Sequence, residues 1–138
     1  MPELIRFGIS LERGLLERFD QLLREKKYTN RSEAIRDLIR ENLVRKEWEE
    51  GKEVAGAITL VFDHHKRELV NILTDIQHDF YRLIISSQHI HLDHNNCLEI
   101  IVVRGKPKDV RELADKLRAT KGVKYGALSI ATTGKELI

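Results

Sequence analysis

Two histidines, a cysteine and a glutamate lie within eleven consecutive residues and could together bind a transition-metal ion. His89 and His91 are separated by one residue, and so are Cys97 and Glu99. Side chains two apart on a strand share a face, and cross-strand neighbours lie about 5 Å apart. If the residues from 93 to 96 form a tight turn, His89, His91 and Cys97 can therefore converge on one ion.

The residues that alternate with these groups are aliphatic, and we expect them to face the core: Ile90, Leu92, Leu98, Ile100 and Val102. The potential ligands would then gather on the opposite face of the hairpin. One thiolate with two or three imidazoles suits Ni(II), Cu(II), Zn(II) or Co(II). A planar arrangement would favour nickel or copper and a tetrahedral one zinc, so the residue types leave the metal open.

The other histidines fall outside this hairpin or in its turn. His78 lies two positions after Ile76 of an apolar helical stripe, about 200° around the helix. It should therefore point away from its own core, where it could reach a metal shared with a neighbouring chain. His64 and His65 precede that helix and His94 lies in the turn. We expect these three to be solvated, with a weak secondary metal site as the alternative for His64 and His65.

The segments that must position these residues alternate between strand and helix periodicity. Period-2 or apolar runs predict strands, and 3.6-residue stripes predict helices. The order is βαββαβ, that of the ferredoxin-like fold. The charged run 45–53, with Gly51, predicts a short hinge and hence two domains. The expected strands cover 57–62, 83–92, 97–103 and 123–131, the helices 69–80 and 107–121, and the domains 1–50 and 51–138.

The N-terminal domain has a different pattern, one strand followed by two helices. Residues 3–11 alternate in polarity, and two apolar stripes follow at helical spacing. Asn30 is a suitable N-cap for the second helix, with Glu33 completing a capping box. A lone strand leaves both edges unpaired. We therefore expect a twofold dimer in which this strand pairs antiparallel with its copy.

The outward face of such a ribbon would carry Arg6, Gly8 and Ser10. A two-stranded ribbon fits the major groove of B-DNA, where arginine reads guanine. Residues 1–48 hold 11 Lys and Arg against 9 Asp and Glu, so they carry the whole net charge of +2. Gly8, the central residue of these three, has no side chain that could reach a base edge.

Length and composition exclude several classes of protein. The 138 residues contain one cysteine, which excludes an intrachain disulfide and fits a reducing compartment. No run approaches the roughly 20 apolar residues of a membrane span, and no secretory signal is visible. We expect a cytoplasmic protein with no membrane association.

The N-terminal pattern resembles the ribbon-helix-helix DNA-binding family. The resemblance rests on the alternating strand 4–11 and on the helix start 30–38. It implies that Arg6, Gly8 and Ser10 read bases, and that Arg31 and Ser32 lie near a phosphate at the start of the second helix.

The joint pattern over nearly the whole chain is similar to that of the NikR family of nickel-responsive transcription regulators. It comprises the helix start at 30–33, Gln77-His78, His89-Ile90-His91 and residues 94–99. The resemblance implies an α+β protein that joins a ribbon-helix-helix domain to an ACT-like βαββαβ domain and forms a homotetramer, a dimer of dimers. It also implies one Ni(II) per subunit, bound by His89, His91 and Cys97 of one subunit and by His78 of another. Gln77 and Glu99 would orient these ligands. Glu33 and Asp37 would belong to a weaker cation site.

The function expected from this resemblance is a repressor that binds a palindromic operator in double-stranded DNA when nickel is bound. The alternative is a ribbon-helix-helix regulator that responds to an amino acid or to copper, cobalt or zinc. An antitoxin is disfavoured because residues 54–131 have the pattern of a folded domain. Catalysis is not expected, because the candidate nucleophile Cys97 and carboxylate Glu99 come with no oxyanion motif.

Overall fold

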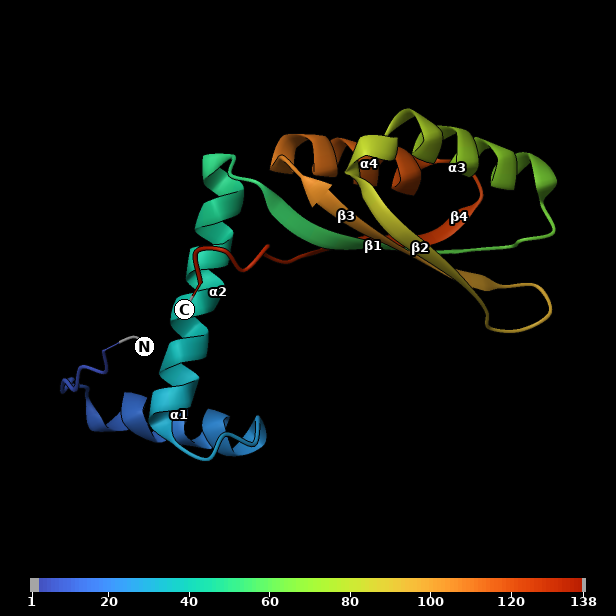
Figure 1. Ribbon diagram of the computed structural model, residues 1–138. Coiled ribbons are helices and arrows are strands. Elements are labelled where there is room, and N and C mark those ends of the chain that lie inside the picture. Colours follow the sequence, from blue (N-terminus) through green and yellow to red (C-terminus); the bar gives the residue numbers. More distant parts are fainter. Residues whose placement is uncertain (1–2, 138) are drawn as a thin grey trace. The chain divides into compact units, whose positions relative to one another are not determined.

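The computed structural model describes residues 3–137, and the chain divides into two compact units, Met1–Glu41 and Asn42–Ile138 (Figure 1). The division falls within one helix, α2 (Arg31–Glu50), so that its first eleven residues belong to the N-terminal unit and its last nine to the C-terminal unit.

The N-terminal unit contains α1 (Arg13–Glu25) and the start of α2. The backbone N–H of Glu33 donates a hydrogen bond of 2.9 Å to Asn30 Oδ1, which confirms Asn30 as the N-cap of α2. Leu23 of α1 and Ala34 of α2 are buried, as their apolar stripes predict. Two helices therefore form where the sequence places them.

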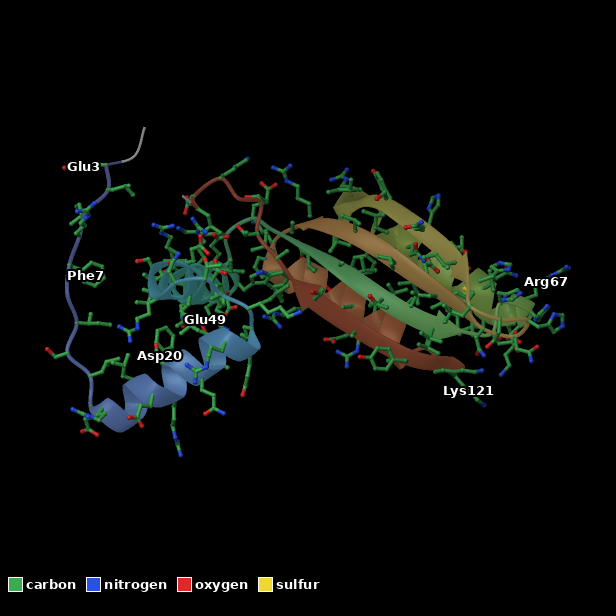
Figure 2. The ribbon with its side chains drawn as sticks, turned by 90° about the horizontal axis from the view of Figure 1, so that it is seen from below. Glu3, Phe7, Asp20, Glu49, Arg67 and Lys121 are labelled. Atoms are coloured by element: carbon green, nitrogen blue, oxygen red, sulfur yellow. The ribbon has the colours of Figure 1, made fainter. Side chains whose placement is uncertain are left out.

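The strand predicted over residues 3–11 is absent from this single chain, since residues 3–12 have no regular secondary structure. Ile5 is 77% and Phe7 72% exposed, although both belong to the apolar set that was expected to be half-buried. The physical reason is that a strand exists only as part of a ladder, and the described chain offers this segment no partner strand. Figure 2 shows Phe7 projecting from this extended segment.

The C-terminal unit is a four-stranded antiparallel sheet whose strands lie in the order β2-β3-β1-β4. Two helices cover one face of the sheet and leave the other open (Figure 1). This topology confirms the predicted ferredoxin-like order. The elements are β1 (Val54–Phe62), α3 (Arg67–Asp79), the short 3-10 helix η1 (Tyr81–Leu83), β2 (Ile84–His91), β3 (Cys97–Gly105), α4 (Pro107–Ala119) and β4 (Val123–Ile130).

The core lies between the sheet and these two helices. Ile58, Leu60 and Phe62 of β1 are at most 1% exposed, as the alternation of β1 predicts. They pack with Leu73 of α3 and Leu113 of α4 in one cluster. Burial of these side chains fixes the sheet against the helices and so holds the β2–β3 hairpin in place.

The charged run that was predicted as a hinge is helical as far as Glu50, and Gly51 ends the helix at a φ of +74°. Trp48 explains the difference, because its ring is 4% exposed and belongs to the core of the C-terminal unit. Its indole N–H donates a 2.8 Å hydrogen bond to the Ala131 carbonyl. The neighbouring Glu47 is also buried and accepts a hydrogen bond from Thr132 Oγ1 at 3.0 Å.

Candidate metal site

The β2–β3 hairpin brings the predicted ligands onto one face. In its register His91 lies opposite Cys97, and His89 lies opposite Glu99. Directly opposed residues of an antiparallel pair point to the same side of the sheet. The parity argument from the sequence is therefore confirmed for these four residues.

The side on which this face lies was predicted wrongly. Cys97 and Glu99 point to the helix-covered face and are 0% and 2% exposed, whereas Val102, on the opposite face of β3, is 36% exposed. The error has a physical reason: Ile101 and Val103 make the inner face of β3 apolar as well. With aliphatic residues on both faces, hydrophobicity alone cannot say which one meets the helices.

His89, Cys97, Glu99 and Gln77 form a connected polar group at this face. Cys97 Sγ lies 3.9 Å from His89 Nδ1, and Glu99 Oε2 lies 3.3 Å from His89 Nε2. Gln77, on α3, donates a 2.9 Å hydrogen bond from Nε2 to Glu99 Oε1. Because a carboxylate only accepts hydrogen bonds, it favours a proton on His89 Nε2 and leaves the Nδ1 lone pair toward the sulfur.

The thiol of Cys97 is held in its protonated form. Burial, and in second place the negative charge of Glu99, raise the pKa of the Cys97 thiol above its ordinary value. A metal ligand must be the thiolate. Binding of an ion to Cys97 would therefore release the proton of this thiol.

The remaining predicted ligands, His91 and His78, are both exposed. The ring of His91 stacks on that of His64, with the centroids 4.4 Å apart and the planes at 20°. His78 lies in the last turn of α3, away from the buried stripe of Leu69 and Leu73, and this orientation agrees with the prediction.

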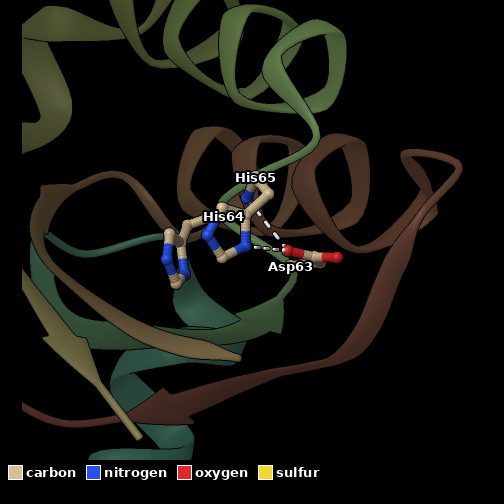
Figure 3. A group of neighbouring side chains, drawn as sticks. All are labelled: Asp63, His64 and His65. Atoms are coloured by element: carbon tan, nitrogen blue, oxygen red, sulfur yellow. Dashed lines mark hydrogen bonds and ion pairs between the residues drawn. The ribbon is translucent and has the colours of Figure 1, made fainter. Parts of the chain in front are cut away.

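The sequence analysis named His64 and His65 as the alternative weak metal site, and it did not include the neighbouring Asp63. Within the described part of the chain, Asp63, His64 and His65 are the group whose ligand atoms all lie within 4.8 Å of one another (Figure 3). Desolvation is the largest cause that lowers the pKa of His64, which favours the neutral imidazole. The sequence did contain a signal, namely an aspartate and two adjacent histidines directly after a buried strand.

The residues predicted to contact DNA lie in the N-terminal unit and are exposed: Arg6, Gly8, Ser10, Arg31 and Ser32. Arg31 is already engaged by Asp20, with contacts of 3.0 and 2.8 Å, and this arginine lowers the pKa of the Asp20 carboxyl. Ser32 occupies the first turn of α2, where backbone N–H groups point out of the helix start.

The two carboxylates of the predicted weaker cation site lie one turn apart on α2. Asp37 accepts a hydrogen bond from the Tyr28 hydroxyl and lies 3.7 Å from Arg40. Glu33 accepts a 3.5 Å hydrogen bond from Thr29. The hydrogen bond to Asp37 is the largest cause that raises the pKa of Tyr28.

Comparison with known protein families accounts for both units. Residues 55–131 match the family described as "NikR C terminal nickel binding domain". The chain belongs to the NikR family. Residues 5–46 match the "Ribbon-helix-helix protein, copG family". Both resemblances inferred from the sequence are thereby confirmed, and so is the α+β fold with a ribbon-helix-helix domain at the N-terminal end.

Relatives that match over nearly their whole length are named "Putative nickel-responsive regulator". The relative from Syntrophus aciditrophicus is 56% identical over 135 residues, which cover 98% of each chain. That from Chlorobium limicola is 58% identical over 97% of this chain and 100% of its own. One from Thermococcus kodakarensis is 54% identical over 99% of both chains. The NikR family consists of transcription regulators rather than enzymes, as the sequence analysis expected.

A solved structure supports the fold alone. Uncharacterized protein TM1266 from Thermotoga maritima superposes with a TM-score of 0.52 at 15% identity. The match covers 57% of this chain and 98% of that protein. In the part of the NikR-family chain that the structure describes, no helix is both long and apolar enough to cross a membrane.

Proposed function

We propose that this protein is a nickel-dependent repressor that binds a palindromic operator in double-stranded DNA when Ni(II) occupies its C-terminal domain. The observation that carries the proposal is the group formed by Cys97, His89 and Glu99, in which a sulfur and an imidazole nitrogen 3.9 Å apart are backed by a buried carboxylate. No hydrolytic or group-transfer chemistry is needed to explain these residues.

The donor set fits a first-row transition ion. A thiolate and imidazoles suit Ni(II), and a carboxylate that orients a ligating histidine is a common feature of such sites. We propose one ion per subunit, bound by His89, His91 and Cys97 of one subunit and by His78 of a partner subunit. Gln77 and Glu99 would orient the ligands. His78 is exposed and therefore accessible to a partner subunit, and the ring of His91 lies against His64.

A homotetramer would supply that partner. The open face of the sheet exposes apolar side chains, among them Ile90 and Val102 at 36% and Tyr125 at 60%. A second copy that packs here would bury them, as an apolar patch of this kind requires. The functional domains would then be residues 1–50, which bind DNA, and residues 51–138, which bind the metal and form the tetramer. The last turns of α2 would pack into the second of these domains.

The N-terminal unit has a surface on which the proposed DNA-binding dimer could form. A hollow of about 570 Å³ lies between the extended segment and α2, lined by apolar side chains such as Ile5, Phe7, Ile35 and Ile39. Pairing of residues 3–11 with the same segment of another chain would complete the sheet and cover this hollow. The ribbon would then present Arg6, Gly8 and Ser10 to the major groove, with Arg31 and Ser32 near the backbone.

Metal and DNA would be coupled through the arrangement of subunits. An ion bound by His78 of a partner subunit would fix one arrangement of the metal-binding domains. That arrangement would in turn determine where the attached DNA-binding domains lie. The coupling is reciprocal, so operator DNA must tighten nickel binding by the same factor. A cation held weakly by Glu33 and Asp37 would stabilise the DNA-binding arrangement further.

The experiment compares wild type with Cys97→Ala. Wild type should bind about one nickel per chain, show the absorption of a planar thiolate-bound ion, and footprint an operator only with nickel present. Cys97→Ala should lose tight binding and footprinting while keeping the circular dichroism spectrum of the folded chain. Nickel-dependent footprinting by this variant would refute the site. A response to an amino acid, or to copper, cobalt or zinc in place of nickel, would support the alternative effector.

A further inference from the structure

We propose that residues 131–137, the tail that follows β4, hold the last turns of α2 on the sheet and in this way carry the effect of nickel binding to the DNA-binding unit. The second part of this proposal rests on the proposed function, whereas the holding of the helix does not. The tail has no regular secondary structure, and Figure 1 shows it in red beside α2. Its contacts with α2 lie within one compact unit, Asn42–Ile138.

Two consecutive residues near the end of α2 are buried, and both bond to the tail. The indole N–H of Trp48 donates to the Ala131 carbonyl at 2.8 Å, and Glu47 accepts a 3.0 Å hydrogen bond from Thr132 Oγ1. Glu47 is only 8% exposed. A buried carboxylate has lost most of its hydration and needs a donor in place of water. The tail supplies that donor.

The tail is itself held in shape at the end of the sheet. The backbone N–H of Ala131 donates to the Ala55 carbonyl at 2.9 Å, which extends the pairing of β4 with β1 by one residue. The backbone N–H of Gly134 donates to Thr132 Oγ1 at 3.0 Å, so the hydroxyl that serves Glu47 is oriented by the turn after it. Gly134 makes this turn possible with a φ of +80°.

An exposed ion pair also joins the tail to the chain just after α2, but it contributes little. Lys52 Nζ lies 2.9 Å from Glu136 Oε2, and the two side chains are 46% and 65% exposed, so water screens both charges. The buried bonds of Glu47 and Trp48 must therefore do most of the holding. The bond of Glu47 is the one to test, because removing it leaves the ring of Trp48 in the core.

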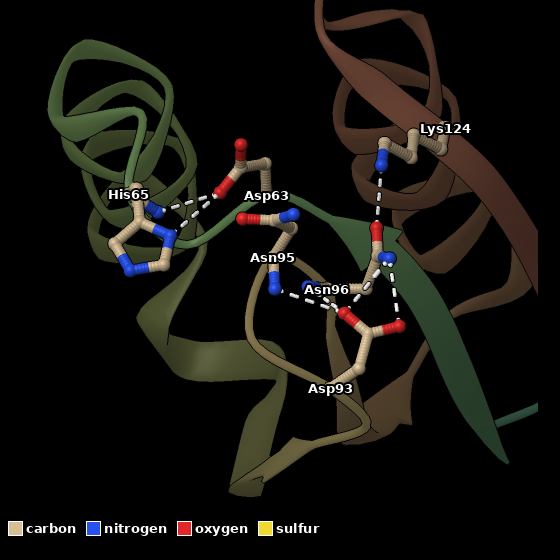
Figure 4. A network of polar contacts seen from close by, with 6 residues as sticks. All are labelled: Asp63, His65, Asp93, Asn95, Asn96 and Lys124. Atoms are coloured by element: carbon tan, nitrogen blue, oxygen red, sulfur yellow. Dashed lines mark hydrogen bonds and ion pairs between the residues drawn. The ribbon is translucent and has the colours of Figure 1, made fainter.

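The strand β4 connects the tail with the hairpin that carries Cys97. At the start of β4 the ammonium of Lys124 donates to Asn96 Oδ1 in the β2–β3 turn, and Asn96 in turn bonds the Asp93 carboxylate (Figure 4). Asn96 directly precedes Cys97. At its other end β4 finishes at Ile130 and continues into the tail. One strand therefore contacts the turn beside a proposed nickel ligand and leads to the contact with α2.

The tail and the proposed nickel ligand lie at opposite ends of β1. In the register of the sheet Cys97 pairs with Phe62, the last residue of β1, whereas Ile130 pairs with Gly56 near its start. Six residues of strand span about 20 Å. A change in the tail should therefore leave the nickel ligands in place, and its effect on DNA binding can be separated from any effect on nickel affinity.

The informative variant is Thr132→Val, which keeps the shape of the side chain and removes the hydroxyl that serves Glu47. Thr132→Ser restores the hydroxyl and should behave like wild type. Thr133→Val is the matched control, because it makes the same change one residue further along at another half-buried position. Among the described contacts, the Thr133 hydroxyl makes no hydrogen bond to α2.

The first measurement is amide hydrogen exchange of the full-length protein without DNA. The amides of residues 44–50 should exchange tenfold or more faster in Thr132→Val, which is the factor expected from loss of a hydrogen bond to a charged group. Thr132→Ser and Thr133→Val should stay within threefold of wild type. Unchanged exchange in Thr132→Val, or an equal increase in Thr132→Ser, would overturn the holding role.

The second measurement is the coupling between nickel and DNA. The probe is duplex DNA that wild type selects from random sequences in the presence of nickel, and the coupling factor is the ratio of nickel affinities with and without this DNA. In Thr132→Val the coupling factor should fall at least fivefold, while nickel affinity without DNA stays within twofold of wild type. Thr132→Ser and Thr133→Val should keep the coupling factor of wild type.

The outcomes separate this proposal from the proposed function. A coupling factor that stays unchanged in Thr132→Val, or a fall in its nickel affinity without DNA, would show that the tail does not carry the effect of nickel to the DNA-binding unit. If wild type selects no DNA with nickel, the proposed function fails, and transmission through the tail fails with it. The exchange measurements would still decide whether the tail holds the helix.

Discussion

Glu99 offers the sharpest test of how the metal site is organised, through the substitution Glu99→Gln. The change keeps the shape of the side chain, and the amide oxygen can still accept the hydrogen bond that Gln77 donates at 2.9 Å. What it removes is the negative charge 3.3 Å from His89 Nε2. The proton is then no longer held on Nε2, so His89 Nδ1 is no longer kept free to face Cys97.

The size of the effect follows from that one contact. A hydrogen bond to a charged group contributes about 1.5–3 kcal/mol, which corresponds to about 10–100-fold in affinity. Loss of a partner that orients a ligating histidine costs a similar factor. The substitution also removes one of the two causes that raise the pKa of Cys97. This gain offsets part of the loss, so we expect nickel binding to weaken by about tenfold.

The assay is a nickel competition titration against a chelator at fixed pH, followed by thiolate-to-metal absorption. Glu68→Gln is the matched control, because it makes the same chemical change at an exposed position on α3 of the same unit. Glu68→Gln should bind nickel like wild type. If Glu99→Gln also binds within twofold of wild type, Glu99 does not orient His89 and the reasoning fails.

Three further predictions concern protons, packing and DNA. Because the raised pKa keeps the Cys97 thiol protonated near neutrality, nickel affinity should fall by about tenfold or more for each unit of pH decrease from 8 to 6; a pH-independent titration would contradict this. Trp48→Ala should lower the free energy of unfolding by about 3–5 kcal/mol in chemical denaturation, and Trp48→Phe by about 1 kcal/mol through the lost bond to Ala131. Arg6→Ala should weaken operator binding by about 1–3 kcal/mol and relax sequence preference in a mobility-shift assay, whereas a uniform loss on all DNA would make Arg6 a phosphate contact.

Local patterns predicted the C-terminal fold well because each element carries its own periodicity. Alternation located β1 and β3, the stripes of α3 and α4 were plain, and Pro107 marked the first residue of α4. The charged run before Gly51 was wrongly predicted to be a hinge, because the prediction used the average composition of the run. One side chain, Trp48, decides its structure by packing into the core.

Strand parity predicted which residues of the hairpin share a face, but it did not predict which face the helices cover. Parity alone puts His89, His91 and Cys97 on one face, since it depends only on strand geometry. Which face the helices cover depends on tertiary packing, and aliphatic residues on both sides of β3 hide that choice. The sequence analysis considered His64 and His65 as a weak metal site but did not include Asp63, because irregular backbone has no period from which side-chain directions can be calculated.

The burial of Cys97 has a consequence for the reactivity of its thiol. Peroxides and alkylating reagents attack thiolates that they can reach, and this sulfur is both fully enclosed and kept in its less reactive state. The chain has no other cysteine with which to form an internal disulfide. The protein without bound metal should therefore tolerate air and react slowly with iodoacetamide until denaturant exposes the sulfur. The cysteine proposed as a metal ligand is in this way also protected from chemical damage.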